Sequence, residues 1–113
     1  MKEGFQTRED KESRARLAGA VPTSLFLVER QLVGITEHQL AMLEAVIAEV
    51  TRRFADRGQT VRLVRSIFLP RQERLMMLFA AGSSEVVQAV NDAALVPFNS
   101  IEPAREMPSQ KGT

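Results

Sequence analysis

Residues 60–81, which read TVRLVRSIFLPRQERLMMLFAA, decide the fold because they contain two β-rich runs with a short polar connection. Apolar residues alternate along residues 60–69 and dominate residues 74–81. The segment between them, Pro70-Arg71-Gln72-Glu73, has the length and composition of a hairpin loop. We therefore predict strands over residues 60–69 and 74–81 that pair with each other in antiparallel fashion.

A long amphipathic helix is predicted before the hairpin. Thr36 and Gln39 have the spacing of a capping box, in which each side chain bonds the other residue's backbone N–H. Apolar residues then recur every three or four positions along residues 40–54, with charged residues between them. Gly58 is placed to end the helix, because a left-handed backbone costs glycine little. We expect one helix from Thr36 to about Arg57.

The other elements complete a ferredoxin-like order. A serine cap at residues 83–84 precedes a second helix that we expect to end near residue 94. Strands are predicted over residues 24–31 and, after Pro97, over residues 98–102. The order β-α-β-β-α-β is the split βαβ of α+β proteins. We predict a four-stranded antiparallel sheet with both helices on one face, and with strands 24–31 and 74–81 at its centre.

Length and charge distribution indicate one domain with two tails. A chain of 113 residues is too short for two full domains. Residues 1–22 are dense in charge and lack apolar periodicity, so we predict a flexible charged N-terminal tail. Residues 104–113 contain Pro108, Gly112 and several polar residues, which predicts a flexible C-terminal tail. The ferredoxin-like domain is therefore placed at residues 23–103.

Composition argues against several classes of function. The formal net charge is +1, which disfavours nucleic acid as a partner because phosphate contacts need a one-sided basic surface. The chain has no cysteine, and therefore no disulfide and no thiolate metal site. No apolar run is long enough to span a membrane, and the N-terminus has no apolar signal-peptide core. We expect a cytoplasmic protein that binds neither nucleic acid nor membrane.

The sequence shows no motif for a metal, a cofactor or a catalytic group. His38 is the single histidine, and without companions it is better explained as an exposed helix residue than as a metal ligand. The glycines are widely separated, so there is no glycine-rich phosphate loop. No nucleophile can be matched with an activating base. We therefore predict no metal and no cofactor, and the pattern identifies no catalytic residue.

Both faces of the predicted sheet are apolar. Strand 24–31 reads SLFLVERQ and strand 74–81 reads RLMMLFAA, so each carries large apolar residues at odd and at even positions. Helices can cover only one face, and monomers rarely expose a large apolar patch. We predict that a second copy covers the other face, which gives a homodimer resembling a dimeric α+β barrel. The alternative is that residues 14–22 fold across the sheet.

Polar residues interrupt these apolar strands at Glu29, Arg30, Arg65 and Ser66. A charge between two apolar faces needs a partner. A salt-bridged network, with Arg30 or Arg65 as the partner of Glu29, is the simpler explanation. A ligand-binding cluster at the mouth of a sheet cavity is the functional one, and Met76 would give such a cavity an adaptable apolar wall.

Strand parity places these charges on the more apolar faces. Arg65 has the same parity as Val61 and Leu63 along its strand, and Glu29 has the same parity as Leu27. Side chains alternate between the two faces of a strand. We therefore expect Arg65 to share a face with Val61 and Leu63.

Three short segments are similar to one family. They are FLVERQLVGIT at residues 26–36, Val61-Arg62 with Arg65-Ser66, and the small-residue turn at residues 81–85. Over about residues 24–102 the chain resembles the small bacterial proteins grouped as domain of unknown function 4242. This resemblance implies a dimeric ferredoxin-like α+β protein; one branch of the family is nickel-binding or nickel-responsive, and most members have no assigned activity.

The sequence departs from that family at the residues that bear on metal binding. Members often carry a cysteine in the third strand and further histidines, whereas this chain has LMMLF at residues 75–79 and lacks both. What the resemblance implies is a set of candidate site residues to which the family assigns no role: Glu29, Arg30, Arg65 and Ser66.

Together these features predict a homodimeric small-ligand-binding or accessory protein. A small apolar or amphipathic ligand is expected between the sheet and the helices near Glu29 and Arg65, with Arg30, Ser66 and Met76 as further binding candidates. One alternative is a cofactor-independent enzyme of the dimeric α+β barrel type, resembling oxygenases and isomerases, which rests on fold analogy. Another is a protein-interaction module that docks through its charged N-terminal tail.

Overall fold

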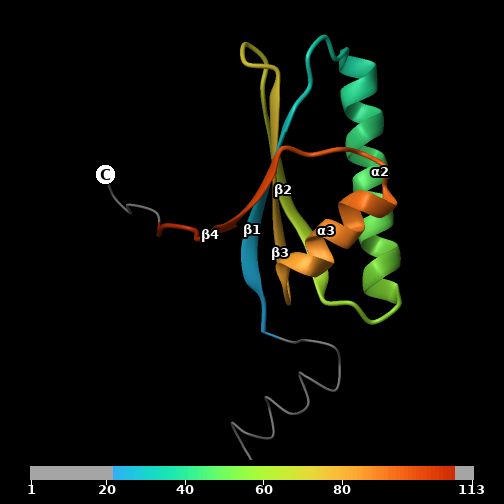
Figure 1. The fold of residues 1–113 in the computed structure, drawn as a ribbon, viewed down its shortest axis with the longest axis vertical. Helices are drawn as coiled ribbons and strands as arrows, with labels where there is room; N and C mark the ends of the chain where they lie inside the picture. The colour runs from blue at the N-terminus through green and yellow to red at the C-terminus, as the bar shows by residue number, and fades with distance from the viewer. Residues whose placement is uncertain (1–21, 109–113) are drawn as a thin grey trace, which may run out of the picture.

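A split βαβ sheet forms in the computed structural model, which describes residues 22–108 (Figure 1). The elements in chain order are β1 (Ser24–Gln31), α2 (Glu37–Asp56), β2 (Val61–Leu69), β3 (Arg74–Ala81), α3 (Ser84–Ala93) and β4 (Ser100–Ala104). The sheet order is β2-β3-β1-β4, and every neighbouring pair is antiparallel. The predicted ferredoxin-like α+β fold is confirmed, with β1 and β3 at the centre. The predicted N-terminal tail lies, except for residue 22, outside the described residues.

Both helices lie on the same side of the sheet, while β4 and residues 105–108 extend from the other side (Figure 1). Side chains at alternate positions of the strands therefore fill the space between sheet and helices. This core consists of Val28, Ile47, Val61, Leu75, Met77, Phe79, Ala81, Val87 and Val90, all 5% exposed or less. The face toward the helices is thus set by Val28 in β1 and by Leu75, Met77 and Phe79 in β3.

The N-terminus of α2 is fixed by the predicted capping box. Gln39 N donates to Thr36 Oγ1 at 3.1 Å, and Thr36 N donates to Gln39 Oε1 at 3.0 Å. At the other end Gly58 has a φ of 94°, which only glycine adopts without strain. The helix buries Ile47 and Thr51, and the Thr51 hydroxyl is satisfied by donating to Ile47 O at 2.6 Å.

The last strand begins later than the predicted start at residue 98. Asn99 N donates to Glu29 O at 2.7 Å, and Asn99 Oδ1 accepts a bond from Gln31 N at 2.6 Å. These two bonds fix where the chain joins the edge of β1, so pairing runs over Ser100–Ala104. Phe98, predicted to lie in the strand, instead packs partly buried against the core.

A β-bulge in β2 changes which residues share a face. Leu63 is paired with Phe79 and Arg65 with the adjacent Leu78, so Val64 is an extra residue without a partner in β3. Before the bulge the odd positions face the helices, and after it the even positions do. The prediction that Arg65 shares a face with Val61 and Leu63 is therefore wrong.

Within residues 22–108, neither helix combines the length and the apolarity needed to cross a membrane.

Candidate functional site

The sheet face opposite the helices, called the uncovered face below, is apolar at its centre. Side chains that alternate with the buried set of β1 and β3, together with those after the bulge in β2, point to this side. They include Leu25, Leu27, Ile67, Leu69, Met76 and Leu78. All are partly exposed, and Ile67 is 50% exposed. The predicted second apolar face is therefore present, and neither helix of residues 22–108 covers it.

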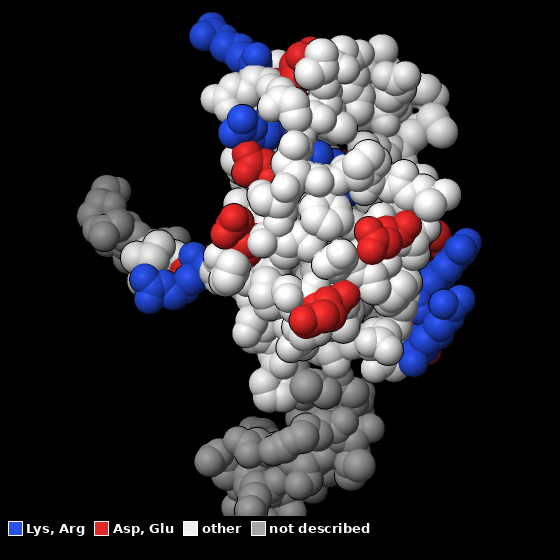
Figure 2. Space-filling view, in the orientation of Figure 1, with Lys and Arg blue, Asp and Glu red and all other residues white. Residues whose placement is uncertain are grey.

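Charged side chains surround this apolar centre. Glu29 Oε2 forms an ion pair with Arg74 Nη1 at 2.8 Å, and both side chains are partly exposed. At the β2 edge, Arg65 Nη2 contacts Glu106 Oε2 at 3.4 Å. Figure 2 shows acidic and basic side chains along the left of the view, the side away from the helices. Glu29 thus has an ion-pair partner, but the partner is Arg74 rather than the predicted Arg30 or Arg65, and the two residues form a single pair rather than a network.

The candidate residues are divided between the two faces of the sheet. Glu29, Arg65 and Met76 belong to the uncovered face, by their register and by alternation with buried neighbours. Arg30 and Ser66 point toward the helices. The structure therefore brings the candidates together in two groups rather than in one cluster.

Arg30 is a buried cation between the sheet and the helices. Its side chain is 1% exposed. Nε donates to Pro97 O at 3.1 Å, Nη1 contacts Met77 Sδ at 3.2 Å, and Nη2 donates to Asn91 Oδ1. Among residues 22–108 no carboxylate forms an ion pair with it. Burial lowers the pKa of Arg30 to about 10, because desolvation penalises the charged form.

Asn91 completes this buried polar group and was not identified from the sequence. It is fully buried, and its Nδ2 donates to Val87 O at 2.7 Å while its Oδ1 accepts from Arg30. A signal was present, because Val87, Val90 and Asn91 have the spacing of one helix face. An amide on a buried face needs a polar partner, and Arg30 was the available one.

Ser66 contributes a second unusual polar atom on the helix side of the sheet. Its Oγ is buried and has no hydrogen-bond partner among the described residues. Ser66 is paired with Met77, whose sulfur is already in contact with Arg30. The interior near Met77 therefore contains polar groups beside the fully buried core.

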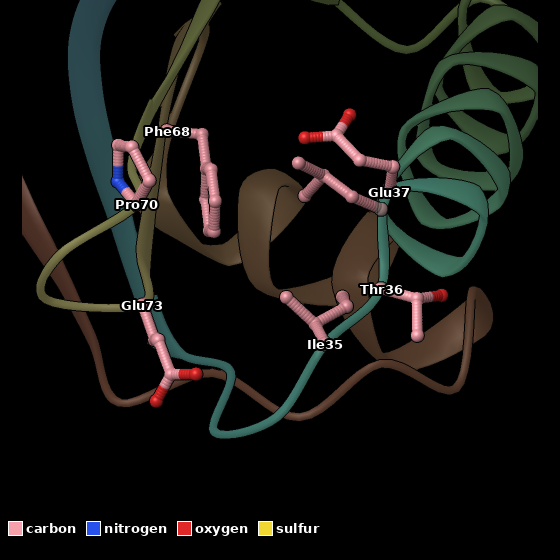
Figure 3. A pocket seen from close by; sticks show the side chains of 7 residues that line it. Ile35, Thr36, Glu37, Phe68, Pro70 and Glu73 are labelled. Atoms are coloured by element: carbon pink, nitrogen blue, oxygen red, sulfur yellow. The ribbon is translucent and has the colours of Figure 1, made fainter.

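A small cleft lies at the N-terminus of α2, away from the predicted site residues. It has a volume of about 170 Å³ and is lined by Ile35, Thr36, Glu37, Leu40, Phe68, Pro70 and Glu73. In Figure 3, Phe68 and Pro70 form one wall and Glu37 lies across the opening. Pockets for small organic ligands usually occupy about 300 Å³ or more. This cleft is therefore too small to serve as the ligand site on its own.

Metal-binding geometry is also missing from the described part of the chain. Residues 22–108 bring no three His, Cys, Asp or Glu side chains close enough together to hold a metal ion. His38 is exposed in the first turn of α2.

A solved structure shares this fold. SCO4226 from Streptomyces coelicolor A3(2) aligns with a TM-score of 0.59 over 77% of this chain and 99% of that chain, with 22% identical residues. At that identity the likeness shows the fold alone. No protein-family model matches the chain. No curated protein matches it either. Fold and site together define a ferredoxin-like α+β protein with one uncovered apolar sheet face.

Proposed function

We propose that the chain functions as a homodimer of the α+β barrel type, in which a second copy covers the uncovered face. The observation that carries this proposal is the group of large, partly exposed apolar side chains on β1, β2 and β3 that the helices do not cover. Soluble monomers rarely expose a contiguous patch of this kind. Two aligned sheets about 10 Å apart would interdigitate their side chains and bury it.

We place a small apolar or amphipathic ligand between the two sheets, beside Glu29, Arg65 and Met76. On the other side of the sheet, Met77 and Phe79 are fully buried beneath the helices. The uncovered face offers Met76 as an adaptable apolar contact and two charged groups that could orient a polar end. Arg74 already engages the carboxylate of Glu29, which favours binding over proton transfer and so favours the binding or accessory role over the enzyme.

We also propose that the chain belongs to the domain of unknown function 4242 family. The ferredoxin-like fold and the apolar sheet face support it, together with the short sequence matches at residues 26–36 and 81–85.

Native mass spectrometry of the full chain, purified without added ligand, tests dimer and ligand together. The wild type should give a dimer, with additional mass if a ligand is retained. Leu78→Lys places a charge at the centre of the uncovered face and should give a folded monomer, as judged by circular dichroism. Val33→Lys is the matched control, because Val33 is 80% exposed in the loop after β1 and should leave the dimer intact.

Two outcomes would contradict the proposal. If the wild-type chain is a monomer, no second copy covers the uncovered face. A dimer that Leu78→Lys leaves unchanged would place the contact on another surface. A dimer without retained mass after gentle purification would favour a purely accessory role over ligand binding.

A further inference from the structure

The cleft at the N-terminus of α2 lies on the other side of the sheet from the uncovered face. Its walls come from two segments that are far apart in the chain, the start of α2 at residues 35–40 and the end of the β2–β3 hairpin at residues 68–73. Phe68 is opposite the buried Leu75, so its side chain points to the helix side. The proposed dimer contact therefore leaves this cleft free.

Hydrogen bonds hold the two walls of the cleft in place. Glu73 O accepts from Leu32 N at 2.7 Å, and Glu73 Oε2 accepts from Gly34 N at 3.0 Å. On the α2 side, the capping box of Thr36 and Gln39 fixes the first turn of the helix. A site whose walls are already ordered loses less conformational entropy when it binds a ligand. The chain therefore forms the cleft in advance of any ligand.

The volume of the cleft matches one small apolar group. At about 170 Å³ it is too small for the larger ligand predicted from the sequence, but it is close to an apolar cavity of about 150 Å³ that admits benzene. Four side chains give it an apolar lining: Ile35, Leu40, Phe68 and Pro70. In Figure 3 the ring of Phe68 points into the space between the hairpin and α2. A single ring or a short alkyl chain can therefore pack there.

Two carboxylates flank this apolar lining, and no Lys or Arg is among the described residues that line the cleft. Glu37 lies in the first turn of α2, and Glu73 lies on the hairpin side (Figure 3). The N-terminus of a helix carries the equivalent of about half a positive charge, which favours an anion. Two full negative charges outweigh it, and Thr36 already accepts from the N–H of Gln39. The cleft therefore favours a cation.

From this combination of size, apolar lining and charge we propose that the cleft binds a small organic ammonium ion, a protonated primary amine attached to a single ring or a short alkyl chain. The apolar part packs against Phe68 and Leu40. The ammonium group lies at the opening and donates hydrogen bonds to the carboxylates of Glu37 and Glu73. This site is independent of the proposed homodimer and of the ligand placed on the uncovered face.

Titration of the full chain with benzylammonium chloride tests the site, with the amide NMR signals of Gly34 and Leu40 as the readout. These signals should shift and reach saturation. Benzyl alcohol, a neutral molecule of similar shape, should bind at least about tenfold more weakly, because it has no charge for the carboxylates to bind. Sodium chloride at matched concentration controls for ionic strength. The absence of a saturable shift, or equal binding of the two probes, would overturn the proposal.

A pair of variants tests whether the carboxylate acts within the cleft. Glu37→Gln keeps the size of the side chain but removes its charge, and it should weaken benzylammonium binding by about fivefold or more. Glu44→Gln is the matched control, because it changes the net charge equally at an exposed position of α2 outside the cleft, and it should leave binding unchanged. Circular dichroism shows whether both variants keep their helices. Equal weakening in the two variants would indicate long-range attraction rather than contact, and would overturn the site.

Failure of this site can be distinguished from failure of the homodimer. Neither Glu37 nor Glu44 lies on the uncovered face, since both belong to α2. Native mass spectrometry should therefore give the same oligomeric state for the wild type and for both variants. A dimer that does not bind benzylammonium would overturn the ammonium site alone, and a monomer that binds it would overturn the homodimer alone.

Discussion

Asn91→Ala is the substitution that most directly probes the buried Arg30. The change removes the amide oxygen that accepts from Arg30 Nη2 and the amide nitrogen that donates to Val87 O at 2.7 Å. Arg30 would then keep Pro97 O, which accepts at 3.1 Å, and the sulfur of Met77 as its contacts in a site that is 1% exposed. Because burial lowers the pKa of Arg30 only to about 10, the side chain stays charged at neutral pH.

The expected loss of stability follows from these contacts. A hydrogen bond to a charged group contributes about 1.5–3 kcal/mol, and a small cavity at a fully buried site adds about 1 kcal/mol. Alanine favours a helix over asparagine by up to about 0.7 kcal/mol, which offsets part of the loss. We therefore expect Asn91→Ala to lower the free energy of unfolding by about 2–3 kcal/mol. Gln88→Ala, an exposed change on the same helix, should change it by less than about 0.5 kcal/mol.

Urea denaturation at a fixed protein concentration measures both variants, because oligomerisation makes apparent stability depend on concentration. A double variant, Arg30→Met with Asn91→Leu, removes the charge and its acceptor together. Its free energy of unfolding should lie within about 1 kcal/mol of the wild-type value, since replacing a buried polar pair by apolar residues of similar volume is often neutral. A loss below about 1 kcal/mol for Asn91→Ala would refute the reasoning, because Arg30 would then have another way to be solvated.

Three further changes test other parts of the fold by the same assay. Ile47→Ala should lower the free energy of unfolding by about 3–4 kcal/mol, because Ile47 is fully buried. Val46→Ala, at a neighbouring position that is 42% exposed, should lower it by less than about 1 kcal/mol. Equal losses would mean that α2 packs against the sheet with a different face. Thr36→Ala should cost about 1 kcal/mol through loss of the capping box, and no loss would show that the cap is replaced by solvent. Ser66→Ala should be neutral or stabilising by up to about 1 kcal/mol, because it removes a buried oxygen without a partner, and a clear destabilisation would reveal a partner for Ser66 Oγ.

Local sequence signals predicted the elements of this fold well. The capping box at Thr36 and Gln39, and Gly58 after the helix, determine both ends of α2 within the chain itself. The hairpin loop at Pro70–Glu73 likewise fixes the pairing of β2 and β3. Such patterns act over a few residues, so they can be recognised without knowledge of the tertiary structure.

The candidate site was harder to predict because it depends on contacts between distant residues. The bulge at Val64 has no glycine to mark it, yet it reverses the face of every later residue in β2, including Arg65 and Ser66. Arg30 is stabilised by Pro97 O, a backbone group far along the chain. The partner of Glu29 proved to be Arg74, which the register of β1 and β3 brings near. Sequence parity alone carries none of this information.

The apolar uncovered face could be anticipated because β1 and β3 are apolar at both parities, whatever their orientation. What covers that face depends on a second molecule. Sedimentation equilibrium of the full-length wild-type chain over a range of concentrations measures this directly. The account predicts a dimer whose dissociation follows a single two-state equilibrium. A monomer at every concentration, with β1 and β3 open to solvent, would contradict it.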